Sequence, residues 1–478
     1  MNRFSRTLIS RWARLGPRFL PFADAATPDL PLSRLLRLSL FQVSVGMALV
    51  LLVGTLNRVM IVELNVPASL VAVMVALPVL YAPFRALIGF RSDTHRSALG
   101  WRRVPFIWMG TMVQFGGLAI MPFALLVLSG GGNSAAWPVW VGQLGAGFAF
   151  LLVGAGLHTT QTAGLALATD LAPEEAQPRV VGLMYVMLLL GTIVSAVIFG
   201  YFLRDFSPGR LVQVIQGAAL ATMVLNSVSL WKQETRYPGR FALQRQRHQP
   251  TFSEAWSTYI EGDGARRRLL AIALGTMAFG MQDVLLEPYG GQILGMGVGE
   301  TTWLTATLAA GGLFGFGLAS SILSRGVDPA RLAVAGAGVG IPAFAAVMLA
   351  ATTQSVALFV CGALLIGFGA GVFSHGTLTV TMHRAPKEQT GLALGAWGAA
   401  QATAAGVAVA LGGILRDIAS ALAVRGVFGE ALAQPATGYA FVYGMEIVLL
   451  VATIAVMSSL VREPHRLPVA PNLPGGRL

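Results

Sequence analysis

The segment APEEAQPRVVG, residues 172–182, has a counterpart in APKEQTG, residues 385–391, and this pair decides the fold. Each motif precedes an apolar run with a similar ending, YFLRD (201–205) after the first motif and GILRD (413–417) after the second. The interval from the first Ala of the motif to the Arg of the ending is 32 residues in one case and 31 in the other. The chain therefore contains a parallel internal repeat, and its two halves should fold alike.

The composition is that of an integral membrane protein. The 478 residues are 55% hydrophobic and only 11% charged, whereas soluble domains carry about 25% charged residues. Apolar segments of about 20 residues, long enough to cross the membrane as helices, recur along the chain. Because the alternating pattern of a membrane barrel is absent, we predict an all-α membrane protein with 12 transmembrane helices. The predicted spans lie near 38–61, 68–90, 104–128, 139–168, 180–203, 210–231, 269–295, 301–323, 332–352, 355–381, 391–415 and 438–461.

Positive charge is concentrated in alternate loops. Of the 33 Lys and Arg residues, 27 lie before the first predicted span, in every second loop or in the C-terminal tail. This distribution follows the positive-inside rule, so both termini should face the cytoplasm. Membrane orientation thus explains the net charge of +12, and we expect no nucleic-acid partner.

Two halves of six spans in parallel repeat are the architecture of major facilitator transporters, which bind substrates between the halves near the membrane midplane. We therefore predict a major facilitator fold. The predicted organisation is a basic amphipathic arm (1–33), an N-terminal six-helix half (34–231), a cytoplasmic central loop (232–268), a C-terminal six-helix half (269–462) and a disordered tail (463–478).

The N-terminal arm has an amphipathic pattern. Its apolar side chains fall on one helical stripe and its five arginines mostly fall outside it. The stripe consists of Phe4, Leu8, Trp12, Leu15 and Phe19. We expect such a helix to lie in the membrane interface and bind anionic membrane lipids, with docking to a partner membrane protein as the alternative.

The loop GFRSDTHRSALGWRR (89–103) resembles the signature loop of major facilitators. In that signature a Gly, an Asp four residues later and a basic cluster lock the cytoplasmic ends of neighbouring helices. Here the interval from Asp93 to Gly100 is longer than usual, and the equivalent segment of the second half, SRGVDPARL, is degenerate, so the fold is better supported than a gate. The candidate residues are Gly89, Arg91, Asp93, Arg96, Gly100, Arg102 and Arg103.

Four longer segments resemble the bacteriochlorophyll delivery branch of the major facilitator superfamily, the PucC and LhaA proteins. The similarity extends over nearly all twelve predicted spans. The Gly-Pro signature of many antiporters is missing from the fifth span, GLMYVMLLLGTIVSAVIFG, which argues against an exporter. The four segments are RLLRLSLFQVSVGMALVLLVGTLNRVMIVEL (34–64), APFRALIGFRSDTHRSALGWRRVPFIW (82–108), FGGLAIMPFALLVLSG (115–130) and GMQDVLLEPYGGQILG (280–295).

The resemblance implies a role in photosynthesis. It implies a multi-pass protein of the bacterial inner membrane, here the intracytoplasmic photosynthetic membrane, that assembles a light-harvesting antenna. The implied cargo is bacteriochlorophyll a, with carotenoid as a second candidate, handed to newly inserted antenna polypeptides, of the core antenna more than of the peripheral antenna. The reaction centre–antenna complex and pigment-synthesis enzymes are further implied partners.

Two histidines lie within spans, His158 in GAGLHTTQTAG and His375 in GAGVFSHGTLT. A magnesium chlorin can accept one axial nitrogen, which a neutral imidazole supplies, so both are candidate pigment ligands. A histidine hydrogen-bonded to a neighbouring helix is the alternative. Since no second His or carboxylate stands at ligand spacing, we expect no metal site beyond an axial bond to pigment magnesium.

Two acids, Asp283 and Glu287, lie one helical turn apart after the apolar run 269–279. Because a charge facing lipid costs about 2.5–3.5 kcal/mol, Asp283 should face the interior. In a major facilitator the first and seventh spans meet near the outer end of the cavity, and the first span carries Arg58. We predict that Arg58 faces the two acids as a gate and leaves any cavity open to the cytoplasm. Two acids exposed to outer water are the alternative.

Arg85 and three glycine pairs are further candidates inside the spans. Arg85 either snorkels to the inner surface or pairs with an acid or a ligand carboxyl. The glycine pairs at four-residue spacing predict close helix approach, with a flat macrocycle lying against glycine as the alternative. These pairs are Gly311 and Gly315, Gly336 and Gly340, and Gly367 and Gly371.

A proton-coupled facilitator of a small solute, in which the acids of the seventh span carry the proton, is the alternative function. No HExxH, GxSxG, CxxC or phosphate-loop motif occurs, so we expect no enzyme. The single cysteine, Cys361, excludes an intrachain disulfide and a thiol-based metal site.

Overall fold

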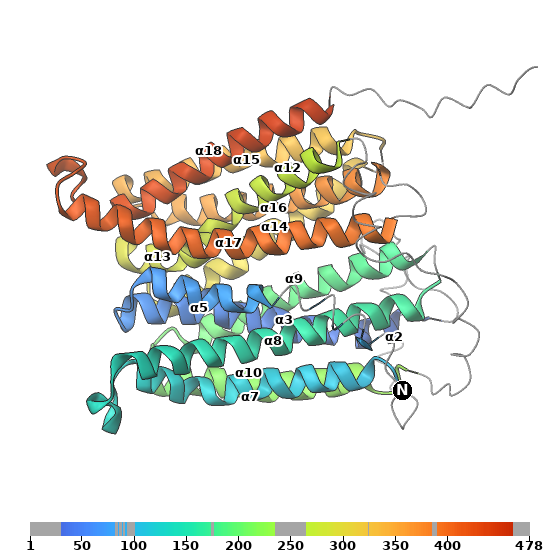
Figure 1. Ribbon diagram of the computed structural model, residues 1–478, viewed down its shortest axis with the longest axis horizontal. Coiled ribbons are helices and arrows are strands. Elements are labelled where there is room, and N and C mark those ends of the chain that lie inside the picture. Colours follow the sequence, from blue (N-terminus) through green and yellow to red (C-terminus); the bar gives the residue numbers. More distant parts are fainter. Residues whose placement is uncertain are drawn as a thin grey trace, which may run out of the picture.

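The computed structural model describes residues 30–81, 85, 88, 91–92, 101–173, 176–234, 264–323, 325–384 and 390–461. Within these ranges the chain forms helices and the loops that join them, so the predicted all-helical fold is confirmed for this part. The long helices run side by side, with those of the N-terminal half (blue to green) below those of the C-terminal half (yellow to red) in Figure 1. The predicted arm, central loop and tail lie almost wholly outside the described residues.

The N-terminal half begins with one long apolar rod, Leu32–Glu63, that includes two π-helical stretches. The parts of this rod are α2 (Leu32–Leu38), α3 (Leu40–Leu49), the π-helical η2 (Val50–Thr55), α4 (Leu56–Arg58) and the π-helical η3 (Val59–Glu63). The other elements of this half are α5 (Ala68–Leu80), α7 (Val104–Leu128), η4 (Gly132–Ala136), α8 (Val139–Leu171), α9 (Gln177–Phe202) and α10 (Pro208–Leu230).

The C-terminal half follows the same order of long helices. Its elements are α12 (Ala265–Gly280), the 3-10 turn η7 (Met281–Val284), α13 (Leu286–Leu294), α14 (Val298–Leu323), α15 (Pro329–Thr353), α16 (Val356–Arg384), α17 (Thr390–Val424), η9 (Glu430–Leu432) and α18 (Ala436–Val461).

Local sequence signals set several helix ends. Ser207 at the start of α10 and Asp328 at the start of α15 each accept a backbone N–H of the first helical turn, at 3.2 and 3.0 Å. Pro208 and Pro329 follow at the first helical position, where a missing N–H costs nothing. Gly295 ends α13 with a left-handed φ of 66°.

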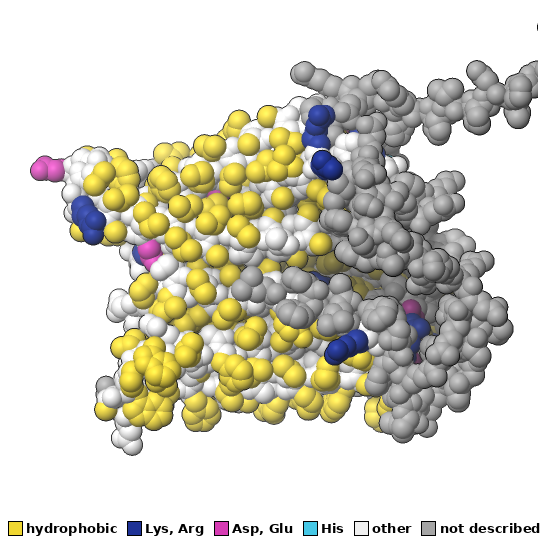
Figure 2. Space-filling view, viewed as in Figure 1, with side chains coloured by type: hydrophobic (Ala, Val, Ile, Leu, Met, Phe, Trp, Pro, Cys, Tyr) yellow, Lys and Arg dark blue, Asp and Glu magenta, His cyan; other side chains and the backbone are white. Residues whose placement is uncertain are grey.

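The helices are long and apolar enough to cross a membrane. Within the described residues ten pass this test, and the bent pair Ala265–Val284 and Leu286–Leu294 makes an eleventh. Ala68–Val79 is a shorter apolar helix, and most of the residues that follow it up to 100 lie outside the described ranges. The count of twelve spans and the cytoplasmic position of both termini therefore stay predictions. Hydrophobic side chains cover the flank of the bundle, while most visible charged side chains lie toward its two ends (Figure 2).

Helix packing in one half is repeated in the other. In the N-terminal half α7 packs against α8, α10 against α7, and α3 against α9. In the C-terminal half the helices at the same places in the order make the same contacts, α15 with α16, α18 with α15, and α12 with α17. The parallel repeat deduced from the sequence is therefore present in the packing.

Two helix pairs join the halves. α5 packs against α17 and α9 packs against α14, and the repeat relates these pairs to each other. Glycine permits both approaches: a Cβ on Gly413 of α17 would lie 2.4 Å from the Cβ of Ala72, and a Cβ on Gly200 of α9 would lie 2.1 Å from the Trp303 ring. Both junctions thus depend on a missing side chain.

The seventh span is broken between α12 and α13, with a bend of 43°. Pro288 explains the break, because in a straight helix its ring would clash with the carbonyl of Val284. At the break the backbone N–H of Gln282 donates to Glu446 Oε1 of α18 at 2.6 Å. The break thus turns a backbone donor toward a buried carboxyl.

Candidate functional site

The first span meets the broken seventh span at one end of the bundle, on the left in Figure 1. We call this end outer, following the orientation that the charge distribution predicts. Arg58, whose side chain is 5% exposed, forms an ion pair with Glu63 of its own span. Its Nη2 also donates to the backbone carbonyl of Met296, just after α13, at 3.2 Å. One guanidinium therefore joins the two halves.

The ion pair that we predicted between Arg58 and the two acids of the seventh span does not form within the described residues. The Glu287 carboxyl lies against Gly54, one turn before Arg58, and Thr305 Oγ1 donates to its Oε1. The guanidinium lies against Gly291, one turn after Glu287. The direct partner of Arg58 is Glu63.

Asp283 is the second acid of the predicted pair, and it is half-buried at the break. Its Oδ1 accepts a hydrogen bond from the side-chain amide of Gln282. Its backbone carbonyl accepts a hydrogen bond from Asn57 Nδ2 of the first span at 3.3 Å. Asp283 therefore contributes to the junction of the halves through its backbone.

The winding of the first span explains why the predicted pair was wrong. In an α-helix, a residue five positions after Arg58 would lie about 140° away around the axis. Residues Val59–Glu63 are instead π-helical, with wider turns that bring Glu63 to the face of Arg58.

Glu446 also belongs to this region, although the sequence analysis did not single it out. It is fully buried in α18, and its Oε2 has no hydrogen-bond partner among the described residues. It is the one acid in the apolar run GYAFVYGMEIVLLVATIAV, residues 438–456. An acid within a span is by itself a signal of function, so the sequence could have identified it.

His158 lies on α8 and faces α5. Gly154, one turn earlier, is in close contact with Pro78 of α5, and the imidazole lies against the Pro78 carbonyl. Its Nδ1 is buried and has no hydrogen-bond partner within the described residues. A neutral imidazole with an unpaired nitrogen can supply an axial ligand.

His375 occupies a related place in the second half. It lies on α16 with its ring edge-on to Phe316 of α14, at a centroid distance of 4.2 Å, and its Nδ1 is likewise buried without a partner in the described part. The repeat relates the α16–α14 pair to the α8–α5 pair. His158 stands 14 residues before the first repeat motif and His375 stands 10 before the second, so they differ by about one helical turn.

Arg85 is bound to α8 next to His158. Its Nε donates to Thr162 Oγ1 at 3.0 Å and its Nη2 donates to Gln161 Oε1 at 3.2 Å. Gln161 in turn donates to Gln42 of the first span at 3.3 Å. No carboxylate of the described part forms an ion pair with Arg85, so its charge stays available for a carbonyl or an anionic group of a ligand.

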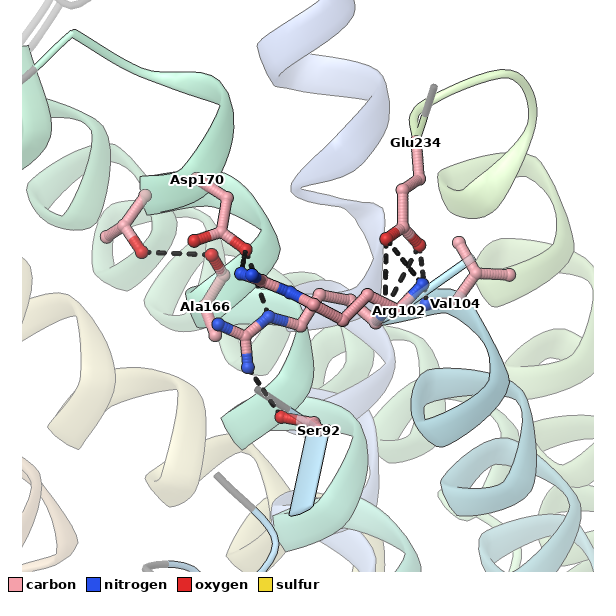
Figure 3. A network of polar contacts seen from close by, with 8 residues as sticks. Ser92, Arg102, Val104, Ala166, Asp170 and Glu234 are labelled. Carbon is pink, nitrogen blue, oxygen red and sulfur yellow. Dashed lines mark hydrogen bonds and ion pairs between the residues drawn. The ribbon is translucent and has the colours of Figure 1, made fainter. Parts of the chain in front are cut away.

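A polar network ties the helices at the inner end (Figure 3). Asp170, at the end of α8, accepts hydrogen bonds from Arg102 Nη2 at 2.5 Å and from Arg103 Nε at 3.0 Å. Arg103 Nη1 also donates to Ser92 Oγ at 2.5 Å. The network therefore links Ser92, which follows the second span, with the start of α7 and the end of α8.

Glu234 completes this network. It follows α10 and accepts the backbone N–H groups of Arg102, Arg103 and Val104 at 2.7 to 3.1 Å. These donors open α7 and have no partner within the helix, so the carboxylate caps it from 130 residues away in sequence. Sequence spacing gave no signal for this contact.

The signature loop is only partly described. Arg102 and Arg103 take part in the network, and Arg91 is an exposed residue of the helical turn that follows the second span. The remaining candidates, Gly89, Asp93, Arg96 and Gly100, lie outside the described residues.

The glycine pairs lie where helices touch, as predicted. A Cβ on Gly311 would lie 2.1 Å from the Leu364 carbonyl oxygen, and one on Gly367 would lie 2.0 Å from the Leu308 carbonyl oxygen, so α14 and α16 touch through their backbones. The same kind of backbone contact, within 2.2 to 2.6 Å, occurs at Gly315, Gly336 and Gly371. A Cβ on Gly340 would instead lie 2.7 Å from the side chain of Leu450.

The family model for the PUCC protein matches residues 55–464. The chain belongs to the PucC family. It is 64% identical over 419 residues to Protein PucC of Rhodovulum sulfidophilum, covering 87% of this chain and 92% of that protein. It is 56% identical over 463 residues to Protein PucC of Cereibacter sphaeroides, covering 97% and 98%. It is 27% identical over 443 residues to the bacteriochlorophyll synthase 44.5 kDa chain of Rhodobacter capsulatus, covering 90% and 95%.

Solved structures support the fold of this PucC-family chain. The crystal structure of a bacterial homologue of the human lysosomal transporter Spinster superposes with a TM-score of 0.65, covering 89% of this chain and 95% of that one at 15% identity. The neighbours are transporters of the major facilitator type, so the predicted fold is confirmed, and at this identity the likeness concerns the fold alone.

Proposed function

We propose that this PucC-family protein is an assembly factor that binds bacteriochlorophyll and delivers it to newly inserted antenna polypeptides. Family membership supports a role in photosynthesis, and one relative is named for bacteriochlorophyll synthesis. A multi-pass chain whose described part consists of membrane helices is suited to carry a pigment that dissolves in lipid.

The observation that carries the proposal is that the buried Nδ1 of His158 has no hydrogen-bond partner among the described residues. Buried polar nitrogens normally have a partner, and a lone imidazole nitrogen beside a glycine-rich helix can bind the magnesium of a flat macrocycle. Arg85, fixed one turn away by Thr162, can donate to a carbonyl group of the same pigment. His375 is the corresponding ligand in the second half.

The clients and partners follow from the same proposal. The cargo is bacteriochlorophyll a, with carotenoid as a second pigment, and the core antenna is the first client ahead of the peripheral antenna. Reaction centre–antenna complexes and pigment-synthesis enzymes are the neighbouring partners in the intracytoplasmic photosynthetic membrane. Since the described part is a helix bundle, lipid-facing helices provide much of the contact.

A proton-coupled facilitator is the second candidate, and one observation favours it. Glu446 and Glu287 are buried, and neither forms an ion pair with a cation in the described part. Broken helices with buried carboxyls are where transporters place coupling ions. On this alternative the protein moves a small solute and carries no pigment.

The two candidates are separated in a phototrophic strain that lacks the chain. We expect antenna absorbance to fall while pigment synthesis continues, with the core antenna affected first. Loss of only the peripheral antenna would mean that the protein assembles the peripheral antenna and not the core antenna. Normal antenna together with proton-driven solute uptake by the purified protein would favour the transporter.

A further inference from the structure

A groove lies between the outer ends of α9 and α10, away from the interior groups described above. Its volume is about 880 Å³, within the range of about 300–1,000 Å³ that is typical of small-molecule sites. The residues that line it are Met47, Ser195, Ile198, Phe199, Tyr201, Phe202, Arg204, Asp205, Arg210, Gln213, Val214, Gly217, Ala218 and Ala221.

The groove opens on the membrane-facing side of the bundle. Ile198, Tyr201 and Phe202 line it and are 46%, 65% and 57% exposed, so the lining is accessible from lipid. Met47 of α3 lines the groove from inside the N-terminal half and is 5% exposed. The walls are therefore apolar and suit an acyl chain.

The polar end of the groove has an excess of positive charge. Arg210 Nη1 forms an ion pair with Asp205 Oδ2 at 3.0 Å. Arg204, which also lines the groove, is exposed, and its guanidinium has no hydrogen-bond or ion-pair partner among the described residues. Two arginines against one aspartate leave a net charge of +1 at this end.

The internal repeat supplies a built-in comparison. Arg204 and Arg416 occupy the same place in the repeat, in YFLRD and GILRD. Arg416 is satisfied by the protein: it forms an ion pair with Asp417 at 2.9 Å and donates to Gln292 at 2.7 Å. Its guanidinium also lies 4.6 Å from the centre of the Tyr439 ring. Among the described residues, Arg204 has none of these contacts, and it lines the groove.

We propose that this groove binds one anionic phospholipid, with its acyl chains against Ile198 and Phe202 and its phosphate at Arg204. Arg204 lies two residues after Phe202, the last residue of α9, at the level where a phosphate meets the hydrocarbon region. A phosphodiester supplies the negative charge that the protein leaves unmatched at this point. A neutral pigment or an apolar helix would not neutralise the positive charge of Arg204.

The bound lipid would lie beside the junction of the halves. A Cβ on Gly299 of α14 would lie 2.9 Å from the Arg204 backbone, and Trp303 donates from Nε1 to the Val197 carbonyl at 3.2 Å. The α9 segment that lines the groove is thus the segment that contacts α14. Lipid binding should therefore raise the thermal unfolding temperature of the protein.

Native mass spectrometry of the purified full-length chain, titrated with phosphatidylglycerol or phosphatidylcholine, tests the site. We expect Arg204→Gln to weaken phosphatidylglycerol binding about fivefold, the loss of one lysine or arginine contact to an anionic lipid. Arg425→Gln, which removes an exposed arginine from the loop between α17 and α18 at the same end, is the matched control and should bind like the wild type.

A second variant fills the groove and keeps its charges. Gly217 lines the groove and a Cβ there would meet nothing within 4 Å, so Gly217→Phe should fold and exclude the lipid. Gly145→Phe, at an equally open glycine of α8, is its control. Equal binding of the two lipids by the wild type, or unchanged phosphatidylglycerol binding in both groove variants, would overturn the proposal. So would an antenna polypeptide held at this surface in place of lipid.

Discussion

The guanidinium of Arg58 pairs with Glu63 of its own span and at the same time donates to the Met296 carbonyl of the other half. Arg58 is buried, whereas Glu63 is 37% exposed, so the acid neutralises the arginine at the edge of the protein. The link between the halves is thus a charged side chain of one half bound to the backbone of the other.

Arg58→Gln should weaken this junction. It removes the donor to Met296 and leaves Glu63 unpaired, so we expect a loss of about 1–3 kcal/mol of stability, measured as a lower thermal unfolding temperature in detergent. A double-mutant cycle with Glu63→Gln should give a clear coupling energy, and a cycle with Asp283→Asn should give almost none. Coupling to Asp283 without coupling to Glu63 would mean that Arg58 pairs with Asp283, contrary to the contacts found among the described residues.

The inner network gives a second prediction. Asp170→Asn removes the carboxylate that Arg102 and Arg103 share, so the ends of α7 and α8 lose their charged link. Because Asp170 is 36% exposed, the loss should be modest, about 0.2–1 kcal/mol, and should appear mainly as reduced antenna assembly at normal protein abundance.

Arg331→Gln is the control for this network. Arg331 lies 4.0 Å from Asp328 and is 73% exposed, so its removal should change neither stability nor assembly. If Asp170→Asn changes neither stability nor antenna assembly, as expected for Arg331→Gln, the inner network does not contribute to either.

Glycine substitutions test the close contact of α14 and α16. Gly367→Ala would place a Cβ 2.0 Å from the Leu308 carbonyl oxygen, which must force the helices apart. We expect a loss of about 1–3 kcal/mol and a lower thermal unfolding temperature. At Gly338 a Cβ meets nothing within 4 Å, so Gly338→Ala should be neutral or slightly stabilising. Equal stability of the two variants would mean that these helices are not in backbone contact.

The fold could be predicted from the sequence because it depends on long-range regularities. These regularities are the apolar segments, the charge bias and the repeat of 172–182 in 385–391. Each concerns whole spans, and a membrane permits few folds that agree with all three. The role of the glycine pairs was predictable because glycine has no side chain and so lets two helices approach closely.

The site was less predictable because it depends on local deviations from α-helical geometry. The π-helical stretch moved Glu63 onto the face of Arg58, and the break between α12 and α13 gave the backbone N–H of Gln282 an acceptor in α18. The cap of α7 by Glu234 joins residues 130 apart without any sequence spacing that indicates it.

The N-terminal arm carries a prediction that rests on the sequence alone. Deleting residues 2–20 should lower antenna assembly, because it removes the basic amphipathic helix that we expect at the interface, while the helix bundle still folds. Antenna absorbance and the thermal unfolding temperature of the purified protein are the two readouts. Replacing the five arginines with Gln, with the apolar stripe kept, separates the charge from the stripe. Normal antenna yield with the truncated chain would rule out a role for the arm.

The central claim is that this protein carries pigment on His158. The most direct measurement is the ratio of bacteriochlorophyll to polypeptide in the protein purified from its phototrophic host, for the wild type, His158→Leu and His383→Leu. His383 is an exposed histidine at the end of α16 and serves as the matched control. We predict bound pigment in the wild type, the same amount in His383→Leu, and loss of most of it in His158→Leu at equal protein abundance. A wild-type protein without pigment, or equal pigment in all three proteins, would contradict the claim.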